Sequence, residues 1–178
     1  MEKRISISKN FYLDEFVDPH TYFNALNSGI GLLSEILFPI AQKLRDYYEE
    51  PIYLNNWWKY YESSANLTNQ QIISDIEYLN HHGKANIWSG YRSPRCRIGA
   101  RRSAHRFGLA IDPKGDEKKF FKIVKDNRQE FYNLGLRRLE DISITPGWLH
   151  MDGAVLNTKP NSIRVVDRTS CTETIFIV

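Results

Sequence analysis

Cysteine is scarce in this sequence, and the apolar runs that export or membrane insertion would need are missing. Only Cys96 and Cys171 occur, and neither belongs to a C-x-x-C pair, which argues against a zinc site built from thiolates. The sequence leaves open whether the two cysteines form a disulfide. The N-terminal segment carries charges but lacks the apolar stretch of a signal peptide, and no run approaches membrane-spanning length. We therefore expect a protein made in the cytoplasm without a signal peptide and without a membrane segment.

A strong charge of either sign is also lacking. Lysine and arginine together number 24 and aspartate and glutamate 21, which gives a formal net charge of +3. This small excess is compatible with an acidic partner without requiring one. The 178 residues are 42% hydrophobic and contain no repeat, low-complexity tract or linker. We therefore expect one globular domain that spans residues 1–178.

Hydrophobic periodicity predicts helices mainly in the first half of the chain and strands mainly in the second. Apolar residues at helical spacing over residues 30–50 predict a long helix with a kink at Pro39. A capping box formed by Thr68 and Gln71 predicts the start of another helix, and residues 116–135 have the acidic start of a third. The predicted strands are 51–56, 85–90, 108–112, 136–140, 147–152, 162–167 and 173–178. This order favours an α+β fold with a central antiparallel sheet flanked by helices.

Two histidines and an aspartate form a candidate metal site. His105 and Asp112 belong to "SAHRFGLAID", residues 103–112, whose apolar second half predicts a buried strand that ends in a carboxylate. Burial of that carboxylate is costly without a cation or several hydrogen-bond donors. His150 lies in "PGWLHMDG", where strand alternation would place it on the same face as Asp152. If folding brings His105, Asp112 and His150 together, they make the three-ligand set of a catalytic zinc ion.

These motifs resemble a known family. "SAHRFGLAID" is similar to the S-x-H-x-x-G-x-A-x-D signature of the zinc D-Ala-D-Ala and L-alanyl-D-glutamate peptidases, in the hedgehog/DD-peptidase superfamily. "SGYRSP", residues 89–94, and "TPGWLHMD", residues 145–152, resemble two further segments of that family, in the same order. "FYLDEFV" followed by a long helix resembles the phage endolysin branch. The resemblance covers residues 89–152 most closely, and the region of about residues 53–84 is treated as an insertion.

The resemblance assigns roles to individual residues. His105, Asp112 and His150 correspond to the zinc ligands, and Arg92 to an arginine that polarises the scissile carbonyl or stabilises its oxyanion. Ser103 corresponds to a polar position beside the site. We also expect Tyr91 and Trp148, which lie within the matching segments, to contact substrate. The implied activity is zinc-dependent hydrolysis of a peptide bond in bacterial peptidoglycan stem peptides, by an endopeptidase or a D,D-carboxypeptidase.

One position departs from the family pattern. Many members have a glutamate or aspartate three residues before the last histidine as the general base, and here that position is Gly147. Asp152 is the first substitute candidate, because strand alternation places it on the His150 face. Glu140 and Asp141, which precede that strand, are the next candidates. Gly147 also supports an alternative reading, a catalytically silent zinc-containing protein with a binding or structural role in a virion.

An arginine-rich segment surrounds the first zinc ligand. Six arginines fall within fifteen residues, at positions 92, 95, 97, 101, 102 and 106. We expect them to attract the carboxylates of stem peptides or anionic wall polymers, and a solvated loop remains an open alternative. Aromatic residues are too sparse among them to favour nucleic acid. If the protein is encoded by a phage or prophage, it would reach the cell wall through lysis of the host or as part of a virion.

A cluster of aromatic residues precedes the predicted capping box. "NNWWKYYESS", residues 55–64, has four aromatic residues in five positions. Such a cluster can form a binding wall for sugars or peptides, because aromatic rings pack well on apolar ligand surfaces. It can equally fill the core beneath a loop, which is the role we expect.

Overall fold

The computed structural model describes residues 4–61, 66–155, 159–167 and 170–177, and in these ranges the chain forms six α-helices and a five-stranded sheet. The α-helices are α1 (Pro19–Ala25), α2 (Leu37–Tyr48), α3 (Trp58–Tyr61), α4 (Asn69–His81), α5 (Glu117–Asp126) and α6 (Arg128–Asn133). The 3-10 helices are η1 (Leu13–Glu15), η2 (Leu26–Leu32) and η3 (Ala104–Phe107). The α+β fold class is therefore confirmed.

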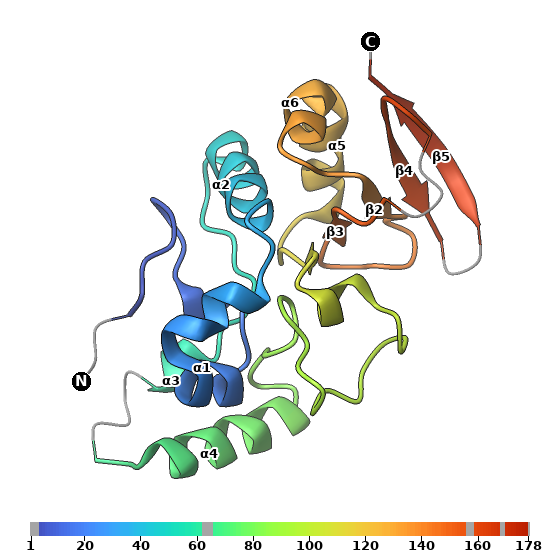
Figure 1. Cartoon of the computed structure of the whole chain (residues 1–178). Helices are drawn as coiled ribbons and strands as arrows, with labels where there is room; N and C mark the ends of the chain where they lie inside the picture. Colours follow the sequence, from blue (N-terminus) through green and yellow to red (C-terminus); the bar gives the residue numbers. More distant parts are fainter. Residues whose placement is uncertain (1–3, 62–65, 156–158, 168–169, 178) are drawn as a thin grey trace.

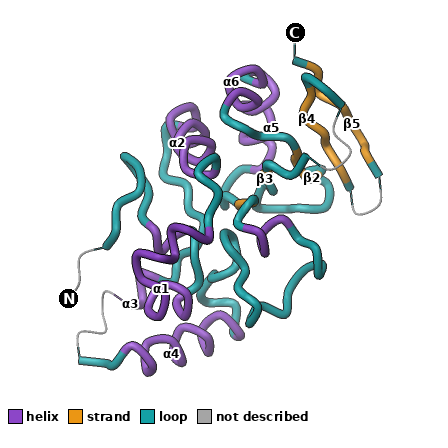
Figure 2. Tube along the Cα trace, viewed as in Figure 1, coloured by secondary structure: helices purple, strands orange, loops and turns teal. Residues whose placement is uncertain are grey.

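The helices are divided between two parts of the molecule. In Figure 1, α1, α3 and α4 lie away from the sheet, whereas α5 and α6 lie beside its strands. Helix α2 contacts both parts, because it packs against α5 and β1 on one side, and its Phe38 ring lies 5.3 Å from that of Phe16, next to η1. Figure 2 shows how much of the remaining chain is loop, including the arginine-rich segment that leads into η3.

The sheet is mixed rather than purely antiparallel. Its strands are β1 (Ala110–Ile111), β2 (Arg138–Glu140), β3 (Met151–Asp152), β4 (Ser162–Val166) and β5 (Cys171–Phe176), in the spatial order β1-β3-β2-β4-β5. The prediction of an antiparallel sheet is wrong at one pairing, because β2 and β4 are parallel. The chain reverses direction between β2 and β3 and again before β4, yet β4 lies beside β2. Two strands separated by two reversals must run the same way.

The capping box is confirmed, whereas the predicted kink is wrong. The Thr68 hydroxyl accepts a hydrogen bond from the Gln71 backbone N–H at 3.3 Å, and the Gln71 side chain accepts one from the Thr68 N–H at 2.9 Å. Pro39 does not kink a helix, because α2 begins just before it and Pro39 lies in the first turn. There its missing N–H would have had no helical partner. The last predicted helix is interrupted at Asn127, which separates α5 from α6.

The predicted strands over residues 51–56 and 85–90 are wrong. Asparagine side chains form most of the hydrogen bonds between the two segments, in place of the backbone hydrogen bonds of a sheet. The Asn56 N–H donates to the Asn86 carbonyl at 3.1 Å, a backbone contact between the segments. In addition, the Asn86 side chain donates to the Leu54 carbonyl at 2.8 Å, and the Asn56 side chain accepts from the Asn86 N–H at 2.6 Å. These side-chain amides satisfy backbone groups that a neighbouring strand would otherwise satisfy.

The aromatic cluster belongs to the core, as predicted, in the part of it that the structure describes. Trp57 is completely buried, and its indole N–H donates to the Val17 carbonyl at 3.0 Å. Its ring makes an edge contact with Tyr22, with the centroids 5.5 Å apart. Trp58 and Tyr60 pack against the same core from α3. Residues 62–64 of the cluster lie outside the described residues.

The two cysteines do not form a disulfide. Cys96 is buried, Cys171 is exposed, and both are free thiols. Among the described helices, none is long and apolar enough to cross a membrane.

A buried carboxyl group near the N-terminus gives the fold a pH dependence. Glu15 in η1 is 4% exposed, and its side chain accepts a hydrogen bond from the Tyr12 N–H at 3.3 Å. Arg4 lies 3.7 Å from the Glu15 carboxylate but forms its closer ion pair with Asp14, at 2.6 Å. Burial, only partly offset by the Tyr12 hydrogen bond, raises the pKa of Glu15 to about 8, from an ordinary value of 4.5.

Substitution of Glu15 by glutamine should therefore stabilise the protein at alkaline pH. Between its unfolded pKa and its folded pKa, Glu15 binds more proton in the folded state, so its contribution to stability falls as the pH rises. Glutamine has no charge to bury and can still accept the Tyr12 hydrogen bond. We expect Glu15→Gln to unfold with a free energy on the order of 2 kcal/mol higher than the parent at pH 9, and with little difference at pH 5.

Denaturant unfolding at the two pH values measures this difference. The exposed Glu35 provides the matched control, and Glu35→Gln should leave the pH dependence unchanged. Equal effects of the two substitutions at pH 9 would contradict the assignment.

Candidate metal centre

The register of two short antiparallel strands brings Asp112 and His150 together. Ile111 of β1 is paired with Met151 of β3. One step further along the same register, Asp112 falls opposite His150. Ile111 and Met151 are completely buried in the core, as is Leu149. The predicted strand over residues 147–152 is wrong in its extent, because only Met151–Asp152 form β3. The predicted alternation holds, since Trp148 and His150 line the cavity whereas Leu149 and Met151 lie in the core.

His105 reaches the same point from η3, through a turn that requires glycine. Gly108 ends η3 with a φ of +64°, and a Cβ atom there would lie 1.9 Å from the Leu32 carbonyl oxygen. No other residue fits such a close approach. The Nδ1 atom of His105 lies 2.7 Å from the Gly90 carbonyl oxygen, which can only accept a hydrogen bond. Nδ1 therefore carries the proton, and Nε2 faces Asp112 and His150.

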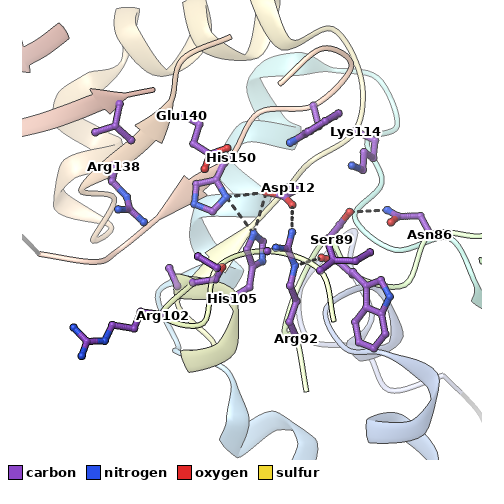
Figure 3. Close-up of a pocket in the computed structure, with 18 of the residues that line it drawn as sticks. Asn86, Ser89, Arg92, Arg102, His105, Asp112, Lys114, Arg138, Glu140 and His150 are labelled. Carbon is purple, nitrogen blue, oxygen red and sulfur yellow. Dashed lines mark hydrogen bonds and ion pairs between the residues drawn. The ribbon is translucent and has the colours of Figure 1, made fainter. Parts of the chain in front are cut away.

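The three ligand atoms converge on one point. His105 Nε2 lies 3.1 Å from Asp112 Oδ1 and 3.1 Å from His150 Nδ1, and the last two atoms are 2.9 Å apart. The three side chains are nearly inaccessible to solvent, with residue exposures between 1% and 5%. Figure 3 shows the two imidazole rings and the carboxylate turned toward one another. The geometry thus identifies a group that could hold a metal ion.

The donor set fits zinc. Ligands at 2.0–2.1 Å in a tetrahedron lie about 3.3 Å from one another, close to the separations between these atoms. On the far side of His150, Nε2 donates to the Asp152 carboxylate at 2.8 Å, so its proton is held there. If both imidazoles are neutral, each directs a nitrogen lone pair at the same point as the Asp112 carboxylate oxygen. These three electron-rich atoms repel one another unless a cation lies among them. Remote N–H groups bound to a carboxylate and to a carbonyl are typical partners of metal-bound histidines.

The charges of the group explain its protonation. Burial opposes ionisation of Asp112, but the two histidines outweigh it and hold the pKa of Asp112 below its usual range. Burial would also lower the pKa of His150, yet hydrogen bonds with Asp112 and Asp152 raise it to about 10. Burial lowers the pKa of His105. A proton on His150 therefore balances the charge when no other cation does, and a metal ion would compete with that proton.

Arg92 contacts the candidate ligand set directly. Its Nη2 atom lies 3.0 Å from Asp112 Oδ2, the carboxylate oxygen that faces away from the histidines, and its Nε donates to the Trp88 carbonyl at 2.9 Å. The guanidinium also lines the cavity above the histidines. Arg92 therefore contacts the candidate metal ligand Asp112 and also lines the cavity in which a substrate would bind.

Asp152 lies behind His150 rather than in front of it. Its carboxylate accepts from His150 Nε2 and, at 2.7 Å, from Arg138. The residue is completely buried, and it is not among those that line the cavity. Against the effect of burial, the hydrogen bond with His150 and the charges of His150 and Arg138 lower the pKa of Asp152. The carboxylate is thus ionised and fully engaged with two cationic partners.

A cavity of about 700 Å³ opens above the His-Asp-His group. Besides Arg92 and the three candidate ligands, the predicted residues Ser103, Glu140 and Trp148 line it, and Tyr91 does not. Figure 3 shows the Glu140 side chain beside His150. No described residue forms an ion pair or hydrogen bond with the Glu140 carboxylate. Among the candidates for a general base, Glu140 is therefore the one whose carboxylate is free to contact a molecule in the cavity. Asp141 instead accepts hydrogen bonds from Ser143 and Thr172.

Gly147 occupies a turn that disfavours an acidic side chain. Its φ is +84°, and its N–H donates to the Glu117 carboxylate at 3.0 Å. A side chain here would project into open space but would strain the backbone. The position of the family's usual acid is therefore shaped for glycine.

Among the cavity residues that the sequence analysis missed are two cations, Lys114 and Arg138. Lys114 lies two residues after Asp112, and Arg138 two residues before Glu140, and all four residues line the cavity. The period of two in extended chain was a signal that could have found both.

The arginine-rich segment does not form one continuous patch. Arg95 pairs with Glu77 at 3.2 Å, and Arg106 donates to the Cys96 carbonyl at 2.7 Å. Arg97, Arg101 and Arg102 are exposed, and of these only Arg102 lines the cavity. The segment therefore contributes Arg92 and Arg102 to the cavity, while Arg95 and Arg106 tie the loop to Glu77 and to Cys96.

Comparison with protein-family models, with curated proteins and with solved structures finds no match to this chain. The site must therefore be interpreted from its own chemistry.

Proposed function

We propose that this protein is a zinc-dependent peptidase with a fold of the hedgehog/DD-peptidase type, and that it cleaves a peptide bond in bacterial peptidoglycan stem peptides. The observation that carries the proposal is the buried His105, Asp112 and His150 group at the base of a polar cavity. The substrate class comes from the resemblance of the three sequence motifs. A phage or prophage protein that acts after host lysis, or as part of a virion, agrees with the same resemblance.

The residues around the ligands have complementary tasks in this proposal. When bound, zinc would polarise a peptide carbonyl and lower the pKa of a water molecule. Asp152 and the Gly90 carbonyl fix the tautomers of the two histidines, so that their ligand nitrogens point inward. Arg92 uses Nε and Nη2 for Trp88 and Asp112, which leaves Nη1 to donate to a carbonyl oxygen as negative charge develops on it.

Glu140 is the general base that we favour. Its carboxylate reaches the cavity, whereas that of Asp152 is held by His150 and Arg138. A base must lie where it can accept a proton from the attacking water. Asp152 is then a positioning residue, which acts through the orientation of His150.

Digestion of purified peptidoglycan tests the proposed function. We expect the zinc-loaded protein to release soluble peptide-containing fragments, whose masses identify the cleaved bond. A zinc chelator should reduce the release to background, and added zinc should restore it. Release that is insensitive to the chelator would exclude a metallopeptidase.

The absence of an acidic side chain at position 147, where the turn favours glycine, supports a second candidate, a zinc-containing binding or structural protein that has lost the reaction. In that case the protein would bind one zinc ion per chain and release no fragments.

A further inference from the structure

Lys114 forms part of the cavity wall next to the candidate ligand Asp112. Its backbone is fixed on both sides, because its N–H donates to the Tyr53 carbonyl at 2.7 Å and it forms an antiparallel bridge with Trp148. Its ammonium lies 4.4 Å from the centre of the Trp148 ring. In Figure 3, Lys114 lies near Asp112 and Asn86, on the opposite side of the ligand group from Arg102. The cation is thus held in one place at the edge of the cavity.

Two other cations around the ligand group, Arg92 and Arg138, are already matched by acids, whereas Arg102 lines the cavity from an exposed position. Arg92 pairs with Asp112 and Arg138 pairs with Asp152. Among the described residues, no carboxylate forms an ion pair with Lys114. The nearest acid is Asp112, which is committed to two histidines and to Arg92. A half-buried ammonium with only an aromatic face as its partner is electrostatically complementary to an anionic ligand.

If the protein is a peptidase, the anion that fits this wall is a carboxylate on a peptide. Zinc and Lys114 would place two positive centres along one wall, and a peptide that presents its scissile carbonyl to the first could present a carboxylate to the second. The indole of Trp148 offers an apolar surface on which a peptide plane or an alkyl segment packs. The free carboxylates of a stem peptide include the α-carboxylate of its γ-linked D-glutamyl residue and its C-terminal carboxylate.

We propose that Lys114 and Trp148 form a subsite for a free carboxylate close to the scissile bond, so that the protein discriminates against peptides in which this group is amidated. The inference rests on the proposed function, which it deepens by naming the substrate feature that is recognised. Lys114 is then a specificity-determining residue that acts on binding, whereas the chemical step belongs to the metal ligands and their neighbours.

Synthetic stem peptides in four forms test the subsite, with the glutamyl α-carboxyl and the C-terminal carboxyl each either free or amidated. For one of the two groups, amidation should raise the KM of the zinc-loaded full-length protein about tenfold, with kcat nearly unchanged. Lys114→Gln should raise the KM for the acidic peptide to the same degree and leave the amidated peptide unaffected. Lys114→Arg should restore most of the preference, and Lys118→Gln, at an exposed position, should change nothing.

Binding measured by calorimetry separates failure of the subsite from failure of the proposed function. Cleavage of acidic and amidated peptides with equal KM would overturn the subsite and leave the peptidase proposal intact. If no peptide is cleaved, the affinities measured by calorimetry decide. Tighter binding of the free-carboxylate peptide than of the amidated peptide, lost in Lys114→Gln, would still support the subsite. Absence of that preference, including absence of binding, would overturn it. The amidated peptides make this test independent of how any variant folds.

Discussion

Replacement of His150 by alanine should remove bound zinc and abolish hydrolysis. The substitution takes away one ligand nitrogen and leaves the Asp112 and Asp152 carboxylates without the imidazole that lies between them. A site with two ligands holds zinc much more weakly than one with three, and the proposed reaction depends on the ion. We expect the zinc content to fall from about one ion per chain to near zero, and kcat/KM to fall by at least about 1000-fold.

Elemental analysis of the dialysed protein, combined with peptidoglycan digestion, measures both effects. His81→Ala is the matched control, since His81 is an exposed histidine at the end of α4, far in sequence from the ligands. It should keep the zinc and the activity of the parent. A His150→Ala protein that retains stoichiometric zinc would place the metal elsewhere and refute the assignment of the site.

The placement of Asp112 and His150 was predictable from local signals in the sequence, whereas the grouping of both with His105 was expected from the family resemblance. The apolar run before Asp112 predicts a buried strand, and the alternation around His150 predicts another. The antiparallel register then forces these two residues to be neighbours. The capping box of α4 was predictable for the same reason, since all of its atoms lie within four residues.

What the sequence did not show depends on contacts between distant segments. Strand β3 pairs with one edge of β2, and β4 pairs in parallel with the other edge. No local sequence pattern predicts which strands become neighbours in this way. Asn86 and Asn56 replace a strand ladder with side-chain hydrogen bonds, which hydrophobic alternation does not reveal. The arrangement around Asp152 is a further case. Strand alternation placed Asp152 on the His150 face, but only the structure shows it behind the imidazole, bound to Arg138.

Glu140→Gln and Asp152→Asn should both reduce hydrolysis, but for different reasons. The dependence of activity on the zinc concentration distinguishes the two effects. Glu140 has no contact with a ligand atom among the described hydrogen bonds, so Glu140→Gln should keep zinc affinity and lose about 100- to 10,000-fold in kcat, the usual contribution of a general base. Asp152 holds the Nε2 proton of His150. Asp152→Asn should therefore weaken zinc binding about 10- to 100-fold, the usual effect of removing a partner of a metal-bound histidine.

Activity measured over a range of free zinc concentrations distinguishes the two acids. The Asp152→Asn protein should recover much of its kcat at saturating zinc, because the asparagine oxygen can still accept a hydrogen bond from His150. The Glu140→Gln protein should remain inactive at every zinc concentration, because no added metal replaces a missing proton acceptor. The reverse pattern would make Asp152 the base despite its burial. Full activity in both variants would mean that another group takes the proton. Asp112 is held by the two histidines and by Arg92, so Asp167, which also lines the cavity, would be the next residue to test.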